Sequence, residues 1–432
     1  MLLPVWVLAV VASGPEPLTL REAASLAAAG APAVARAAAD SVRARAGEAA
    51  ARSRLGPSLS LDFGAASTND PVNAFSLALK QERFSAAEFF ASDPNHPGFV
   101  RDWNAGVTAA WNVDLFGAVR GEARSAGAEA DAATRTAHRA KDVTVAEAVA
   151  AFAAARQAQS ALELLAGRKA DAEKDVSIAS ALAEQGFTTR ADPARTRAAL
   201  SEVLAEIAGR RSALEQARAS LAVLIGQEAA RRPLAELPEA RLSAEETPGE
   251  RDDVAAAELA AQSARDLEKA AAGARWPSLL VLGRYELHAP SPGGRWGDSA
   301  SVFGGFRVPL FASGGVASRI AEARASALSA DAAALQARRQ AEREIASARA
   351  ALDAARSREE AYAEAEAAAT QAREIQQARY EEGVARLADL LEARAAELHA
   401  RLGLFAARSE RAVAHANLRL ALGLPPVEEE SP

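Results

Sequence analysis

The hydrophobic pattern of the chain changes its period twice, each time from alternating positions to the spacing of a helix. The first change lies in WNVDLFGAVRGEARSA (Trp111–Ala126) and the second in FRVPLFASGGVASRIAEA (Phe306–Ala323). Strict alternation is typical of a strand with one apolar face, whereas apolar residues three and four apart are typical of a helix. The pattern therefore predicts two places where a strand leads directly into a very long helix.

Each of these helices is preceded by a predicted pair of strands. Alternating apolar positions define the strands at Ser58–Ala66, about Val107–Leu115, about Val281–Leu287 and about Val302–Val308. The two hairpins thus span 58–116 and 278–311, and the first carries a long, irregular loop at 67–104. Strands of about ten residues are long enough to cross a bilayer when tilted.

Helical periodicity fills most of the remaining chain. It covers about 119–185, about 193–225, about 316–382 and about 387–422. The longer helices would reach on the order of 100 Å at 1.5 Å per residue. They are rich in Ala, with Arg and Glu at the other positions, so we expect them to pack closely against further helices rather than stand alone.

Short turns reverse the chain at the far ends of these helices. The turns are predicted at 186–191 and 383–386, where Gly186 and Gly383 suit the left-handed conformation that ends many helices. Asp192 before Pro193 predicts the start of the returning helix, with Asp192 as its cap.

The two halves of the chain are similar in sequence. Pro57 corresponds to Pro277, and Phe116 corresponds to Phe311, with 25 more residues between the two landmarks in the first half. The predicted organisation is a first repeat at 14–226, a linker at 227–252, a second repeat at 253–423 and an acidic tail at 424–432. An insertion of this size belongs in a surface loop.

The N-terminus starts with a short apolar run followed by small residues. We expect residues 1–13 to be a signal peptide, although the positively charged start of such peptides is missing; the alternative is a buried N-terminal strand. No other stretch resembles a transmembrane helix, so any membrane insertion has to use strands.

Composition excludes several classes of function. A net charge of −7 and a pI near 5.6 argue against a nucleic-acid partner. The chain has no Cys, and its five His residues show no metal-ligand spacing. Phosphate-binding and nucleophile motifs are also missing. We therefore expect no catalysis, no cofactor and no metal site.

Taken in order, five motifs resemble those of the TolC-like outer-membrane efflux protein family. They are LTLREAASLA (Leu18–Ala27), LGPSLSL, VPLFASGG, RYEEGVARLADLLEARAA and the terminal LALG. The resemblance implies a mainly α fold with a membrane β-barrel part. Three subunits would share a 12-stranded β-barrel, with four strands per protomer, that continues into a trimeric α-barrel of long antiparallel helices.

The resemblance also implies a function and a location. The protein would be the exit duct of a tripartite efflux or type I secretion system in the outer membrane of a Gram-negative bacterium, with its helical part in the periplasm. Its partners would be two further copies of itself, outer-membrane lipid, a periplasmic adaptor (membrane fusion) protein and an inner-membrane transporter.

Site residues are carried over from the family's motifs. Asp389 and Glu392 would form a pore constriction, although the alternative is that both are ordinary solvated helix charges. Tyr380 and Asp192 would latch the periplasmic end, and Arg386 or Arg190 would replace the family's gate arginine, which falls at Ala385. The tips that contact the adaptor would be Gly186, Phe187, Thr188, Thr189, Gly383, Val384, Ala385 and Arg386.

Three questions stay open from the sequence. The chain could instead be an elongated periplasmic coiled-coil scaffold or adaptor without a pore. An enzyme of unrecognised type is a second alternative, disfavoured because no constellation of polar residues is present. The loop at 67–104 would lie outside the cell or fold inward as a plug.

Overall fold

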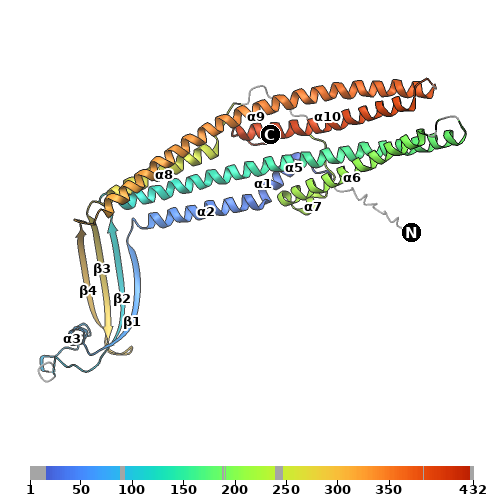
Figure 1. The fold of residues 1–432 in the computed structure, drawn as a ribbon. Coiled ribbons are helices and arrows are strands. Elements are labelled where there is room, and N and C mark those ends of the chain that lie inside the picture. Colours follow the sequence, from blue (N-terminus) through green and yellow to red (C-terminus); the bar gives the residue numbers. More distant parts are fainter. Residues whose placement is uncertain are drawn as a thin grey trace, which may run out of the picture. The chain divides into compact units, whose positions relative to one another are not determined.

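The computed structural model describes residues 16–87, 93–186, 189, 191–238, 247–382 and 384–428. The proposed signal peptide at 1–13 lies outside these residues. The described chain is mainly helical, with one four-stranded sheet (Figure 1). None of its helices is both long enough and apolar enough to cross a membrane.

The order of elements repeats once along the chain. The elements are α1 (Leu20–Gly30), α2 (Pro32–Ser53), β1 (Ser58–Thr68), α3 (Pro71–Lys80), β2 (Val100–Val113), α5 (Ala118–Glu184), α6 (Asp192–Ile225), α7 (Gln227–Ala230), α8 (Asp252–Gly273), β3 (Ser278–Ala289), β4 (Gly297–Arg307), α9 (Gly315–Glu381) and α10 (Leu387–Ala421). Each half runs helix, strand, strand, long helix, helix. The two long helices, α5 and α9, have 67 residues each, which confirms the predicted switch from strand to long helix.

Two compact units make up the chain, and each draws on both halves of the sequence. The first unit comprises 1–40, 134–255 and 336–432, and the second comprises 41–133 and 256–335. Both α5 and α9 begin in the second unit and end in the first.

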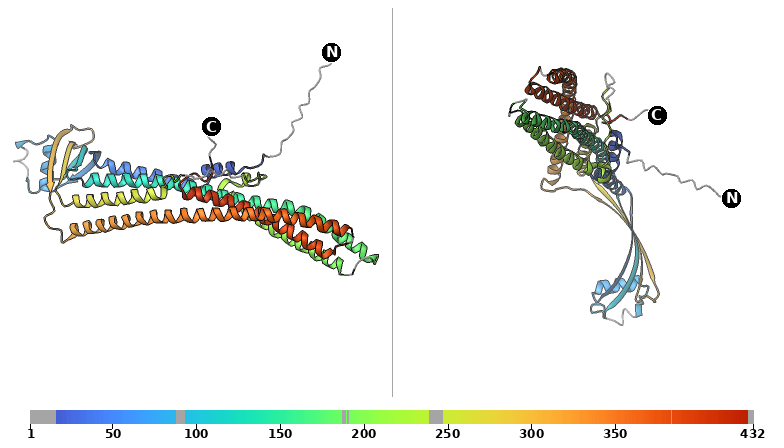
Figure 2. Two further views of the ribbon diagram at one scale, coloured as in Figure 1. Left: turned by 90° about the horizontal axis from the view of Figure 1, so that it is seen from above. Right: turned by 90° about the vertical axis from the view of Figure 1, so that its right-hand side faces the viewer.

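The second unit contains an antiparallel sheet with the strand order β1-β2-β3-β4, and Figure 2 shows how strongly its strands twist. The register pairs Leu61 with Val107, and Val107 with Tyr285. Because paired residues share a face, the apolar positions of all four strands form one surface. Its exposed members include Leu59, Leu61, Phe63, Val107, Trp111, Tyr285, Val302 and Phe306. Phe63 and Val302 are 76% and 84% exposed, so nothing in the described part of the chain covers these two side chains.

The first hairpin differs from its prediction at the loop. β2 begins at Val100, and the loop is not irregular throughout, because it contains α3. Asp70 caps this helix by accepting a hydrogen bond from the Asn73 backbone N–H at 2.8 Å, and Pro71 occupies its first turn. Both are strong helix-start signals, so the prediction of an irregular loop is wrong for residues 71–80.

The second hairpin is shorter than its prediction. Strand β4 ends at Arg307, so Val308 lies beyond the strand. Pro309 follows directly, and a proline cannot donate a hydrogen bond to a neighbouring strand.

Close packing joins the strands to the helices within the second unit. Trp111 donates its indole N–H to the Leu55 carbonyl at 2.9 Å, and Phe116 stacks on Trp276 with ring centroids 5.5 Å apart. At Gly121 of α5, an added Cβ would lie 2.8 Å from the Cβ of Ala270 in α8. The two helices thus meet backbone to backbone just below the sheet.

The first unit has its own apolar core around the N-terminal segment. Leu18 pairs with Leu234 across a short parallel bridge and is fully buried with Phe152 and Leu221. The predicted linker at 227–252 therefore takes part in this core through α7 and Leu234.

Two arginines close the end of α10 in the same unit. Arg139 donates to the Leu420 carbonyl at 2.7 Å, and Arg251 donates to the Ala421 carbonyl at 3.3 Å. Carbonyls in the last turn of a helix lack their usual partner four residues on, and the arginines add donors there beside the Gly423 backbone N–H, which also donates to the Leu420 carbonyl at 3.2 Å.

The contact between α5 and α8 yields a first prediction. Replacing Gly121→Leu forces the Ala270 backbone to move and should lower the free energy of unfolding by about 1–3 kcal/mol. The matched control is Gly209→Ala on α6, where no atom lies within 4 Å of the new Cβ. This change should leave stability unchanged or raise it by up to about 1 kcal/mol. The thermal unfolding midpoint, followed by circular dichroism, measures both; equal midpoints for Gly121→Leu and the parent would contradict the close packing.

Candidate functional site

At the first turn between the long helices, α5 ends as predicted, but the residue that caps α6 differs from the prediction. Gly186 has a φ of 76°, the left-handed conformation expected there. Asp192, however, is the first helical residue, and Ala191 holds the capping position without a side-chain hydrogen bond. The predicted capping role of Asp192 is thus wrong, because Ala191 already has helical backbone angles. The Asp192 carboxylate still lies in the first turn, where its negative charge stabilises the helix by interacting with the positive end of the helix dipole.

The second turn places both candidate pore acids on the surface of α10. Arg386 holds the capping position, and its backbone N–H donates to Oδ2 of Asp389 at 3.3 Å. Asp389 and Glu392 are both exposed and lie one helical turn apart. The backbone N–H groups of Val384 and Ala385 donate to the Arg379 carbonyl at 2.8 and 3.1 Å, which closes the end of α9.

Three predicted tip residues and one predicted latch residue lie outside the described residues. The tip residues are Phe187, Thr188 and Gly383, and the latch residue is Arg190. Thr189 and Gly186 belong to the first turn, and Val384, Ala385 and Arg386 belong to the second.

Tyr380 of α9 lies in a charged environment built by all four helices of the hairpins. Burial raises the pKa of its hydroxyl, and the nearby carboxylates of Asp175 and Asp192 raise it further, whereas Arg394 opposes them. The hydroxyl therefore keeps its proton at neutral pH and can donate it to a carboxylate. The structure thus brings Tyr380 into electrostatic contact with Asp192, the partner named from the sequence.

Two further members of this cluster were not found from the sequence. Arg394 of α10 forms an ion pair with Asp175 of α5, and both side chains are mostly buried. The two residues are 219 positions apart. Arg394 directly follows ADLLEA, which belongs to a motif shared by the two halves, and this motif is the signal that could have identified it. No local sequence signal marks Asp175.

Neighbouring helix turns carry more ion pairs of the same kind. Glu397 of α10 accepts from Arg373 of α9 at 3.2 Å and pairs with Arg401 at 3.0 Å. We call Asp175, Asp192, Tyr380 and Arg394 the tip cluster. Its Arg394–Asp175 ion pair links the two helical hairpins.

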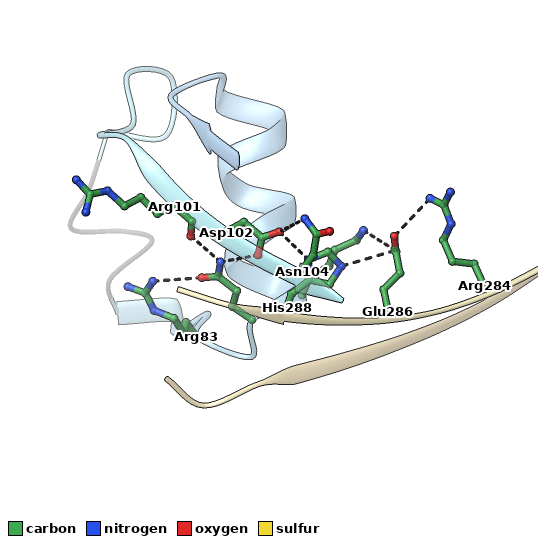
Figure 3. Close-up of polar contacts among 9 residues, drawn as sticks. Arg83, Arg101, Asp102, Asn104, Arg284, Glu286 and His288 are labelled. Carbon is green, nitrogen blue, oxygen red and sulfur yellow. Dashed lines mark hydrogen bonds and ion pairs between the residues drawn. The ribbon is translucent and has the colours of Figure 1, made fainter. Parts of the chain in front are cut away.

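A second polar group, also missed from the sequence, lies on the sheet near the loop end. We call Lys80, Gln81, Asp102, Glu286 and His288 the sheet-end cluster. Figure 3 shows its contacts running from Arg83 to Arg284. Asp102, 2% exposed, accepts from Gln81 and from Nδ1 of His288, each at 2.9 Å. Nδ1 carries the proton, because a carboxylate only accepts.

The remaining contacts extend this cluster along one face. Nε2 of His288 lies 3.6 Å from Oε2 of Glu286, and Lys80 donates to the same oxygen at 3.2 Å. No group of three or more His, Asp or Glu side chains in the described part of the chain could hold a metal ion.

Comparison with known proteins decides the family. The sequence profile of the outer membrane efflux protein family matches residues 23–227 and 245–424, which is most of the chain. This chain belongs to the outer membrane efflux protein family. No curated protein sequence matches it.

Solved structures agree with this fold. A membrane protein from Pseudomonas aeruginosa is 23% identical, with a TM-score of 0.80 over 94% of this chain and 90% of that one. The Campylobacter jejuni CmeC outer membrane channel is 18% identical, with a TM-score of 0.81 over 95% and 87%. The open state of the Neisseria gonorrhoeae MtrE outer membrane channel is 23% identical, with a TM-score of 0.77 over 94% and 89%.

Membership gives this efflux protein its location and general role. It is an outer-membrane efflux channel whose helical part lies in the periplasm. The family is one of passive channels and not a class of enzymes.

Asp389 allows a prediction that separates a structural role from a role of its charge. Asp389→Ala removes the acceptor for the Arg386 N–H and should destabilise the start of α10 by about 1 kcal/mol. Asp389→Asn keeps an oxygen acceptor and should cost much less. Hydrogen exchange of the backbone at residues 387–391 should rise in the first variant and stay near the parent in the second; equal exchange in all three proteins would show that the cap contributes nothing.

Proposed function

We propose that three copies of this efflux protein form one continuous duct across the outer membrane and periplasm. The observation that carries this proposal is the sheet, which has an exposed apolar face and two unpaired edge strands among the described residues. Backbone groups inside a bilayer need hydrogen-bond partners, and four strands are too few to close upon themselves. Pairing β4 of one copy with β1 of the next gives a closed barrel of 12 strands.

The sides of this barrel follow from the register. The apolar face, with Phe63, Val107 and Val302, turns toward outer-membrane lipid. The opposite face carries Asp62, Thr108 and Arg284, which suit a water-filled lumen. The long helices continue the wall of the duct into the periplasm.

The turns at the ends of the helices meet the rest of the export system. A periplasmic adaptor protein binds the turns at 186–191 and 383–386, and an inner-membrane transporter supplies the cargo, which is then expelled passively. Small molecules are the cargo of an efflux system, and proteins are the cargo of a type I secretion system. The exposure of Val384 at 66% supports a contact surface at the second turn.

Asp389 and Glu392 line the narrowest part of the duct in this proposal. Both carboxylates are exposed on α10, and no ion pair holds either among the described residues. Three copies of each around one axis would create a strong negative potential that attracts cations and repels anions.

The tip cluster is the proposed latch of the closed state. The Asp192 carboxylate acts on the Tyr380 hydroxyl through its charge, and in the closed state the hydroxyl would donate to it, while the Arg394–Asp175 pair joins the two hairpins. Arg386 is exposed at the start of α10 and is a candidate to bridge neighbouring copies; Arg190, the other candidate from the sequence, lies outside the described residues.

Planar lipid bilayers test the duct and its acidic constriction together. The purified parent protein should insert as a trimer and give stepwise currents that select for cations. The double variant Asp389→Asn with Glu392→Gln preserves shape and helix cap but removes six charges per trimer, so cation selectivity should fall several-fold. A parent protein that never conducts would refute the duct, whereas unchanged selectivity in the variant would refute only the acidic ring.

The latch gives a separate prediction. Tyr380→Phe deletes the hydroxyl whose pKa is raised by burial and by its carboxylate neighbours, and should increase the time spent open by roughly tenfold, the effect of losing the proposed hydrogen bond to a charged group in the closed state. Tyr362→Phe on the same helix is the matched control, because the Tyr362 ring contacts Gly403 and lies outside the tip cluster. Single-channel recordings measure the open fraction. Equal open fractions for the two variants would remove Tyr380 from the latch.

A further inference from the structure

Helix α3 is attached to the polar face of the sheet, on the side opposite the apolar surface. Lys80, its last residue, donates to Glu286 at 3.2 Å, and the following Gln81 donates to Asp102 at 2.9 Å. Glu286 and Asp102 alternate with the apolar Tyr285 and Trp103, so both acceptors belong to the polar face. The sheet end to which α3 is attached is the one remote from the long helices (Figure 1).

The attachment is also a close backbone contact. A Cβ added to Gly297, the first residue of β4, would lie 2.3 Å from the Lys80 carbonyl oxygen. No side chain fits between the helix end and the strand, so α3 rests directly on the sheet. Arg295 just before β4 pairs with Glu82 at 2.9 Å and adds a further contact from the other side.

Burial makes this attachment rigid. Gln81 is 1% exposed and Asp102 is 2% exposed, and the Gln81 amide donates both to Asp102 and to the Arg101 carbonyl at 2.8 Å. His288 supplies another donor to the same carboxylate. Moving α3 away would leave a buried carboxylate short of a donor, which is costly.

Only the first hairpin has this feature. The strands of the second hairpin are joined by residues 290–296 alone, whereas the first connection carries α3 and is much longer. On α3, Val72 and Leu79 remain 76% and 48% exposed. The helix therefore adds bulk on the polar side of the sheet beyond what a connection between two strands requires.

We propose that α3 is a plug in the outer mouth of the channel, fixed to the lumenal wall by the sheet-end cluster. This inference rests on the proposed function, since it takes the polar face as the lumen. Three copies of α3 then project into one barrel at its extracellular end and exclude bulky solutes arriving from outside. Gln81, Asp102, Glu286, His288 and Gly297 are the residues that set its position.

Cysteine labelling in whole cells tests the plug, because the chain has no Cys of its own. Ser301→Cys lies on the polar face of β4, four residues or about 13 Å from Gly297 toward the helices. Val302→Cys lies next to it on the apolar face. Each is treated from outside with a small charged methanethiosulfonate and with a maleimide attached to a bulky polyethylene glycol.

The plug is then loosened in the Ser301→Cys background. Gly297→Val forces α3 off the sheet, and Gln81→Ala removes its buried hydrogen bonds; replacing residues 71–82 with as many Gly and Ser residues leaves all strand residues intact. Gly304→Val is the matched control, because Gly304 lies in the same strand on the opposite face with no atom within 4 Å of its new Cβ. Variants are compared at equal amounts in the outer membrane.

The small reagent should label Ser301→Cys in every background and Val302→Cys hardly at all. The bulky maleimide should label Ser301→Cys about tenfold faster once α3 is loosened, and at the parent rate with Gly304→Val. Equal rates of bulky labelling in the parent and the loosened variants would overturn the plug while leaving the channel intact. If the small reagent reached Ser301→Cys no better than Val302→Cys, the polar face would not be a lumen, and the proposed duct would fail with the plug.

Discussion

The structure depends on a sheet whose edges and apolar face have no partners in the described part of one chain. Four antiparallel strands leave two edges with unpaired backbone N–H and C=O groups, and one face of the sheet consists of exposed apolar side chains. In water such a surface would aggregate, and in a bilayer the edges would be intolerable. Association of edges with edges in lipid removes both problems at once. A lipid environment is therefore a physical requirement of the sheet, and the family places it in the outer membrane.

The position of the sheet also determines where the long helices start. Both strand pairs return to the same end of the sheet, so α5 and α9 leave it there with 67 residues each. Close approach at Gly121, where no side chain fits beside Ala270, holds α5 against α8. Small residues thus serve a geometric purpose in this chain, because helices that form the wall of a narrow tube have to pack with their backbones close together.

Charged groups fix the local arrangement within each unit. In the first unit the Arg394–Asp175 pair links helices of both hairpins, and in the second unit Asp102, which accepts from Gln81 and His288, anchors α3. Buried charges contribute little net stability, but they fix one arrangement because any other leaves a charge unpaired. An ion pair can also be released by a competing charged group, whereas an apolar contact of the same area cannot be released in this way.

The sequence by itself determined the elements and their order. Alternation in SLSLDFGAA and the helical spacing after Phe116 show which face of each segment is apolar. This is a local property that can be seen directly in the sequence. Motifs also assigned roles to Asp389, Glu392 and Tyr380, which stay predictions, and the structure shows that the charge of Asp192 acts on the Tyr380 hydroxyl. Helix α3 was not predicted, although Asp70 and Pro71 are signals for its start. The prediction that Asp192 caps α6 was wrong. Only the tertiary structure paired Asp175 with Arg394 and Asp102 with His288. Such pairs join residues far apart in the chain, and their meeting depends on helix packing and strand register, which no local pattern encodes.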